Sequence, residues 1–259
     1  MLRSQAWRAA AAAALLGTGA HAAESVTGRV GNGHGARGYE LRVPSGHDAR
    51  QPLPLLVALH GCLQTPAQLA GVARLDRLAD EKRILVLYPE QSVAANPARC
   101  WNWFNPSDQQ RGSGEPALIA SMIDEVRSKH AVDAARIYVA GISAGGMLSG
   151  TLLACYPDVF AAGAIVAGGM YRAANGLAEG MSVMRSGSAY DPQVRGEEAW
   201  KCGGSLAPRP VPVLVVHGDA DSVVAPVNAD QAVAQFLRTN DFADDGSANG
   251  SVGGKLADG

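Results

Sequence analysis

The sequence predicts an α/β fold in which helices flank a mostly parallel β-sheet. Two observations carry this prediction. Continuous apolar runs of strand length recur along the 259 residues, as expected of parallel strands buried on both faces. Between these runs lie segments whose apolar residues recur at helical spacing. The composition agrees, because 47% hydrophobic and 18% charged residues are typical of a globular chain with a sizeable core.

The order of these runs gives the expected elements. Residues 25–43 predict two exposed strands around a glycine-rich turn, and the buried strands are predicted at residues 53–60, 84–88, 136–140, 161–167 and 211–217. Helices are predicted to begin near Pro66, Pro116 and Pro226, since proline is favoured in a first helical turn. Another is predicted from Ala144. Residues 90–114, residues 168–210 and the chain after Asn240 are predicted to be loops.

The first residues predict a secretory signal peptide over residues 1–22. Arg3 and Arg8 form a basic start, residues 9–16 are apolar, and residues 20–22 have the small-x-small pattern of a cleavage site. The alternative is a disordered, alanine-rich leader. A signal peptide predicts a periplasmic or extracellular protein, where disulfides persist.

Charge and motifs exclude several classes of function. The net charge of −2 lacks the basic surplus of a nucleic-acid-binding protein, and no apolar run reaches the roughly 18 residues of a membrane span. P-loop, H-E-x-x-H and C-x-x-C motifs are missing from the sequence, which therefore predicts no cofactor and no metal. A G-x-G-x-x-G match at residues 33–38 precedes a strand rather than opening a helix, which argues against a dinucleotide site.

Residues 141–145 match the G-x-S-x-G pattern of a nucleophile elbow, with Ser143 as the nucleophile. The bare pattern is weak in a chain with 31 glycines. Its position raises its value, because the motif lies directly between a predicted buried strand and a predicted helix. The helix N-terminus would favour developing negative charge beside the serine. The alternative is a glycine-rich turn with a capping serine.

A serine nucleophile also needs an oxyanion hole, an acid and a base. The expected oxyanion donors are the backbone N–H groups of Ala144 and Cys62, the latter in the His60-Gly61-Cys62 turn after an earlier strand. An ordinary tight turn is the alternative for this segment. Asp221 is the favoured acid, and its neighbour Asp219 is interpreted as a turn residue.

The general base is not evident from the sequence. In hydrolases with a G-x-S-x-G elbow, the catalytic residues follow one another along the chain in the order serine, acid, histidine. No histidine follows Asp221 in this sequence. His60 and His217 lie at strand ends near the expected site. Each is better explained by local turn structure.

Two tryptophans and four cysteines complete the candidate residues. Trp101 and Trp103 lie in the long loop beside Cys100 and are equally consistent with substrate contact and with core packing. Four cysteines allow three disulfide connectivities, and sequence arithmetic does not choose between them. They are Cys62, Cys100, Cys155 and Cys202.

Several segments resemble secreted polyhydroxyalkanoate depolymerases, and more broadly the esterase family that unites poly(3-hydroxybutyrate) depolymerases with feruloyl and acetylxylan esterases. The resemblance covers roughly residues 36–240. It rests on the segments HGCLQTPAQLA, CWNWFNPSDQQRGSGEPALIASMIDEV, IYVAGISAGGM, ACYPDVFAA and VVHGDADSVV.

The resemblance implies an α/β-hydrolase catalytic domain over residues 23–259. Ser143 and Asp221 would act in the hydrolysis of short-chain 3-hydroxyalkanoate esters, with feruloyl or acetylxylan ester cleavage as the alternative. It also implies bridges joining Cys62 to Cys100 and Cys155 to Cys202. Family members continue through a further strand to a loop with the catalytic histidine, so we expect this domain to lack both and to be C-terminally incomplete. A catalytically dead hydrolase-like module is therefore a second hypothesis.

Overall fold

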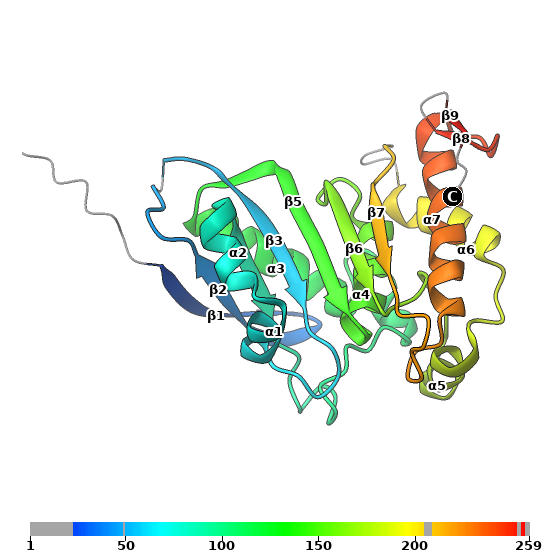
Figure 1. Cartoon of the computed structure of the whole chain (residues 1–259), viewed down its shortest axis with the longest axis horizontal. Helices are drawn as coiled ribbons and strands as arrows, with labels where there is room; N and C mark the ends of the chain where they lie inside the picture. The colour runs from blue at the N-terminus through cyan, green and yellow to red at the C-terminus, as the bar shows by residue number, and fades with distance from the viewer. Residues whose placement is uncertain (1–22, 49, 205–208, 253–254, 257–259) are drawn as a thin grey trace, which may run out of the picture.

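The computed structural model describes residues 23–48, 50–204, 209–252 and 255–256, and the expected signal peptide lies outside them. Within these residues seven strands form one sheet in the order β1-β2-β4-β3-β5-β6-β7 (Figure 1). The strands are β1 (Glu24–Asn32), β2 (Gly35–Val43), β3 (Leu53–Leu59), β4 (Leu85–Pro89), β5 (Val132–Ile142), β6 (Ala162–Val166) and β7 (Val213–Val216). The strands β1 and β2 form an antiparallel hairpin, and β2 also pairs antiparallel with β4. The other pairings in this sheet are parallel. The predicted mostly parallel sheet is confirmed.

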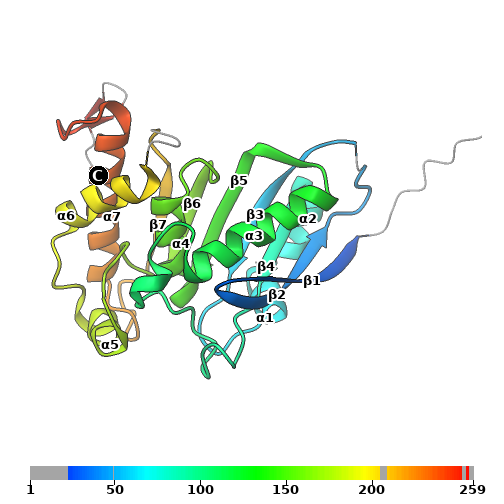
Figure 2. The same cartoon turned by 180° about the vertical axis from the view of Figure 1, so that it is seen from behind.

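Helices cover both faces of this sheet. They are α1 (Pro66–Ala73), α2 (Leu75–Lys82), α3 (Gly114–Lys129), α4 (Ala144–Cys155), α5 (Leu177–Ser186), α6 (Pro192–Gly203) and α7 (Val227–Asp245). The pair α1 and α2 contacts β3 and β4 on one face, whereas α3 and α4 lie on the other, as the two opposite views show (Figures 1 and 2). This is the arrangement expected for buried parallel strands.

The helix predicted from Pro66 is two short helices with a break at Arg74. Thr65 caps the first one through a capping box with Gln68, and Pro66 occupies its first turn. Arg74 is in the left-handed region at φ 51° and ends α1 before α2 begins. Thr65 and Pro66 indicate the start of the helix in the sequence, but no glycine or proline marks the break at Arg74.

Two of the predicted loops contain helices. Residues 168–210 hold α5 and α6, of which α6 opens at Pro192 with Asp191 as its cap. The chain after Asn240 continues α7 to Asp245, because the Phe242 ring stacks on Trp200 of α6 at a centroid distance of 5.2 Å. These helices bury few large apolar residues, so their periodicity was weak. A small hairpin follows, formed by β8 (Ser251–Val252) and β9 (Lys255–Leu256).

The carboxyl ends of the central strands are aligned at one edge of the sheet. Leu59 of β3 pairs with Gly141 of β5, and Val166 of β6 pairs with both Ile142 and Val216. The residues that follow these strands therefore emerge side by side. Ligand and catalytic sites of open α/β sheets form at this edge.

The strand β7 is an edge of the sheet within the described residues. The prediction that residues 211–217 form a buried strand is wrong in one respect, because alternate side chains of β7 face outward, with Leu214 62% and Val216 45% exposed. In the same part of the chain, no helix is both long and apolar enough to cross a membrane.

Candidate active site

Ser143 occupies the sharp turn between β5 and α4. Its backbone has φ 56° and ψ −122°, outside the regions favoured by residues with a side chain. The turn is held by two backbone hydrogen bonds, in which Ser143 N–H donates to Val166 O (2.9 Å) and Met147 N–H donates to Ser143 O (3.0 Å). The side chain is half-buried. This geometry is that of a nucleophile elbow.

Two glycines allow the elbow to lie close to its neighbours. A Cβ at Gly141 would clash with the carbonyl oxygen of Gly145, and a Cβ at Gly145 would clash with those of Leu59 and His60. Helix α4 thus approaches the end of β3 at backbone distance. The glycines of the sequence motif are required by this close approach rather than by their dihedral angles.

The turn after β3 lies directly beside the serine. A Cβ added at Gly61 would be 3.3 Å from the Cβ of Ser143. The N–H groups of Cys62 and Ala144 have no hydrogen-bond partner among the described residues. The Ala144 N–H is at the N-terminus of α4, where unpaired N–H groups favour negative charge. Both expected oxyanion donors are therefore free to donate to a ligand oxygen.

Asp221 lies in the loop after β7. Its Oδ1 accepts hydrogen bonds from the N–H groups of Val223 and Val224, both at 2.9 Å, and these bonds hold the pKa of the carboxyl below its usual range. The side chain is therefore a carboxylate at neutral pH. Its Oδ2 is 3.4 Å from Nε2 of His217, which also lies 2.8 Å from Val224 O.

Neither candidate histidine is hydrogen-bonded to the serine among the described residues. His217 is directed at Asp221 and Val224 O, as just described, and its Nδ1 is buried without a hydrogen-bond partner among the described residues. His60 is fully buried and bonds Gly61 O and Gln91 N–H. In the described part of the chain no hydrogen bond joins Ser143 Oγ to a histidine. Both residues thus have the local structural contacts that the sequence analysis favoured for them.

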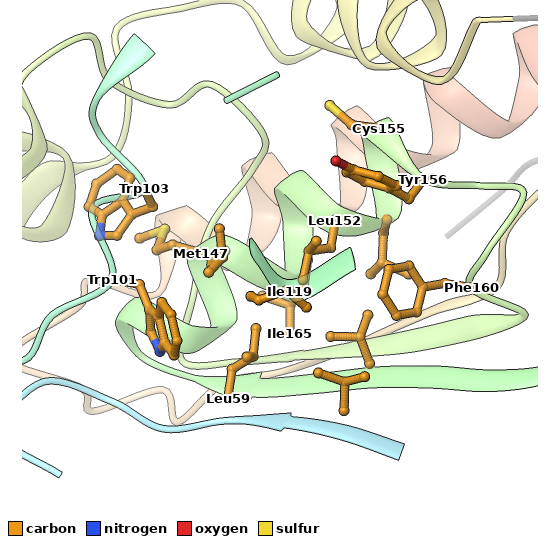
Figure 3. Close-up of a cluster of buried hydrophobic side chains, with 14 of the residues drawn as sticks. Leu59, Trp101, Trp103, Ile119, Met147, Leu152, Cys155, Tyr156, Phe160 and Ile165 are labelled. Atoms are coloured by element: carbon orange, nitrogen blue, oxygen red, sulfur yellow. The ribbon is translucent and has the colours of Figure 1, made fainter. Parts of the chain in front are cut away.

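Trp101 and Trp103 are core side chains. Trp101 is 0% exposed and Trp103 5%, and both belong to the buried cluster that includes Leu59, Met147 and Ile165 (Figure 3). The Trp101 Nε1–H donates to His60 O at 3.0 Å. Of the two roles left open by the sequence, this burial favours packing over substrate contact.

Two disulfides are present, Cys62–Cys100 and Cys155–Cys202. They are the pairs that the family resemblance implies. The first joins the turn beside Ser143 to the long loop after β4. The second ties the end of α4 to α6.

A buried polar network behind this turn was not anticipated from the sequence. Gln91 lies at its centre. Its Oε1 accepts a hydrogen bond from Arg37 Nε at 2.6 Å, and its Nε2 donates to Cys100 O at 2.9 Å and to Glu115 Oε1. Burial and the nearby Asp108 charge raise the pKa of Glu115, although hydrogen bonds from Asn102 and Gln91 oppose this effect. These polar residues come from β2, from the loop after β4 and from α3, with no regular spacing in the sequence, so only the tertiary structure brings them together.

A cavity of about 400 Å³ lies elsewhere, between α1 and the β2–β4 region. Its lining includes Glu40, Arg42, Arg74 and Tyr88 but not Ser143. Among the described residues no cluster of three or more His, Cys, Asp or Glu side chains could hold a metal ion. The strained serine with two free N–H donors is therefore the stronger candidate.

Comparison with known proteins decides the family. The profile of the Esterase PHB depolymerase family matches residues 37–255, which is most of the chain. The chain belongs to this family. It is 37% identical over 213 residues to poly(3-hydroxyalkanoate) depolymerase C of Paucimonas lemoignei, and the match covers 82% of this chain and 50% of the relative.

More distant esterases share the same sequence region. Feruloyl esterase B of Thermothelomyces thermophilus is 30% identical over 190 residues, covering 71% of this chain and 64% of the relative. The chain thus spans about half to two thirds of the length of these curated relatives. The solved acetyl xylan esterase from Aspergillus awamori superposes with a TM-score of 0.72 at 23% identity, covering 86% of this chain and 82% of that one. This likeness identifies the fold as the α/β-hydrolase fold.

Proposed function

We propose that this family member is a serine esterase whose nucleophile is Ser143, and that it acts on short-chain 3-hydroxyalkanoate esters. The observation that carries the proposal is the elbow geometry of Ser143 beside the free N–H groups of Cys62 and Ala144. The serine would attack the ester carbonyl, and the two adjacent N–H groups would stabilise the negative charge that forms on the carbonyl oxygen.

The reaction would proceed through an acyl-enzyme. Ser143 Oγ attacks the ester carbonyl carbon as its proton passes to a base, and the carbonyl oxygen becomes an oxyanion held by the two N–H groups. One such donor lowers the barrier by roughly 3 kcal/mol. Collapse expels the alcohol, and attack by water then releases the hydroxy acid and regenerates the serine. Asp221, held as a carboxylate, would orient and stabilise a protonated imidazole.

Among the described residues no histidine is hydrogen-bonded to Ser143 Oγ, so the proposal still needs a base. Imidazole in solution is the same chemical group as the histidine side chain and can replace it as a proton acceptor. We therefore propose that imidazole accelerates hydrolysis by this chain, and that the acceleration requires Ser143.

Similarity to the Paucimonas depolymerase favours hydroxyalkanoate esters over feruloyl esters, because identity is higher and a larger part of this chain is matched. The predicted signal peptide and the two disulfides support secretion, since disulfides persist in oxidising compartments. Residues 23–259 would then be the mature domain.

The test is release of 3-hydroxybutyrate from short oligomers, with and without imidazole. We expect hydrolysis that imidazole increases and that Ser143→Ala abolishes. Parallel assays on methyl ferulate and acetylated xylan compare the alternative substrates, and a higher rate on either one would reassign the substrate class.

Ser186→Ala is a matched control, because this serine lies at the end of α5 and its Oγ bonds only Ser182 O within the described residues. It should leave the rate unchanged. Hydrolysis that survives Ser143→Ala would overturn the proposal, as would its absence at every imidazole concentration. The lack of a described histidine at Ser143 would then favour the second hypothesis, a hydrolase-like module without catalysis.

A further inference from the structure

The peptide group between Gly61 and Cys62 carries the N–H that we assign to the oxyanion hole. A trans peptide is planar, so its C=O and N–H point in opposite directions. Any contact that holds the Gly61 carbonyl therefore also orients the Cys62 N–H. Nδ1 of His60 lies 2.7 Å from this carbonyl oxygen, which also accepts a longer hydrogen bond from the Gln64 N–H at 3.3 Å.

The partners of His60 determine which ring nitrogen carries the proton. Gly61 O can only accept a hydrogen bond, so Nδ1 must donate. The N–H of Gln91 donates to Nε2 at 3.1 Å, so Nε2 must accept. The ring is thus the neutral tautomer with both nitrogens satisfied, which fits its complete burial.

The same glutamine supports the other side of the peptide. Its side-chain Nε2 donates to Cys100 O at 2.9 Å, and Cys100 is bonded to Cys62 by the disulfide. Gln91 therefore braces Gly61 through the His60 ring and Cys62 through the disulfide. Trp101 adds a third restraint by donating to His60 O.

We propose that His60 is a positioning residue of the esterase site, which orients the Cys62 N–H toward the oxyanion by holding the Gly61 carbonyl with Nδ1–H. This inference rests on the proposed function, because it needs Ser143 to form a tetrahedral adduct. In this role His60 neither transfers a proton nor contacts the substrate.

Two substitutions separate the two bonds of the ring. The amide nitrogen of asparagine occupies the place of Nδ1, so His60→Asn keeps a donor for Gly61 O and loses the acceptor for Gln91. The amide of glutamine reaches the place of Nε2, so His60→Gln keeps that acceptor and loses the donor. Each variant loses one buried hydrogen bond, and a purely structural role predicts similar effects of both.

The probe is butylboronic acid, which needs no catalytic base to form its adduct. The Ser143 oxygen bonds to boron, the hydroxyl proton passes to the buffer, and a tetrahedral boronate places an oxygen in the oxyanion hole. We expect His60→Gln to weaken binding by roughly 10- to 100-fold, below the roughly 10²- to 10³-fold effect of removing an oxyanion donor outright. His60→Asn should bind within about threefold of the parent chain, because it restores the donor that the inference requires.

Imidazole-assisted hydrolysis supplies the second readout. A donor used only in the transition state changes kcat and leaves KM unchanged. We expect this pattern for His60→Gln, together with a shifted NMR signal of the Cys62 amide. His130→Gln is the control, because this histidine follows α3 at the opposite end of the sheet.

The outcomes separate the two proposals. If the parent chain forms no boronate adduct that depends on Ser143, the proposed function fails and this inference fails with it. If the parent chain forms the adduct and the Asn and Gln variants lose affinity equally, only the positioning role of His60 is overturned. The Cys62 amide signal tests the same role without catalysis, since equal shifts in both variants contradict the orientation argument.

Discussion

At the scale of single residues, the position of Ser143 depends on glycines, because a residue without a side chain lets the turn lie against the neighbouring backbone. Gly145 is packed against the carbonyl oxygens of Leu59 and His60, which are backbone atoms that cannot move independently of β3. Gly71 of α1 is a useful contrast, because a Cβ there would meet nothing within 4 Å. The same chemical change therefore has opposite consequences at the two positions.

We expect Gly145→Ala to destabilise the protein by about 1–3 kcal/mol, because the end of β3 must shift to admit the methyl group. Gly71→Ala should stabilise it by about 0.4–1 kcal/mol, since alanine restricts the unfolded chain at no steric cost. Denaturant titration measures both changes. Equal effects at the two positions would contradict the packing argument.

At the scale of elements, the two disulfides bridge different parts of the fold. Cys62–Cys100 joins the turn after β3 to the loop after β4 across 38 residues, and Cys155–Cys202 joins α4 to α6 across 47 residues. Closing loops of these lengths stabilises by about 4 kcal/mol each in the chain-entropy model. Their effects on stability should therefore be similar, while only the first touches the proposed oxyanion donor.

Replacing either cysteine pair by serine should lower the free energy of unfolding by comparable amounts. Only Cys62→Ser with Cys100→Ser should also reduce boronate affinity, because the Cys62 N–H then loses one of its restraints. Calorimetry and boronate titration measure the two effects. A loss of affinity in the Cys155→Ser, Cys202→Ser variant of the same size would count against a local role of the first bridge.

At the scale of the whole molecule, the sheet formed by the described residues has an apolar edge at β7. Leu214 and Val216 of β7 are exposed on the edge strand, and Val223 in the following loop is 68% exposed. An edge strand offers unpaired N–H and C=O groups to other chains, and exposed apolar side chains strengthen such contacts. Association of copies through β7 is the expected consequence.

Leu214→Lys should therefore reduce association with little change in stability, because a charged side chain on an edge strand opposes pairing. Val72→Lys is the matched control, since Val72 is 78% exposed on α1, away from the edge. Light scattering at increasing protein concentration measures the difference. An equal benefit from both substitutions would attribute the effect to net charge alone.

Much of the fold was predictable because local patterns carry it. The runs of β3 to β7 are continuous and apolar, although β7 is partly exposed rather than buried, and the turn at Ser143 combines glycines with an immediate change from strand to helix. The helices α5 and α6 and the end of α7 were missed. Their stability comes from contacts such as Phe242 on Trp200, which join residues far apart in the chain.

The candidate site divides in the same way. The sequence by itself determined the elbow at Ser143 and the family, and it predicted the two oxyanion donors and the acid, because these depend on short motifs at strand ends. Only the tertiary structure decided that Trp101 and Trp103 are buried and that His60 and His217 bond elsewhere than Ser143. It also brought Gln91 and Glu115 behind the Gly61–Cys62 peptide. The physical reason is that burial and hydrogen-bond partners are properties of distant segments meeting in space, which no local spacing records.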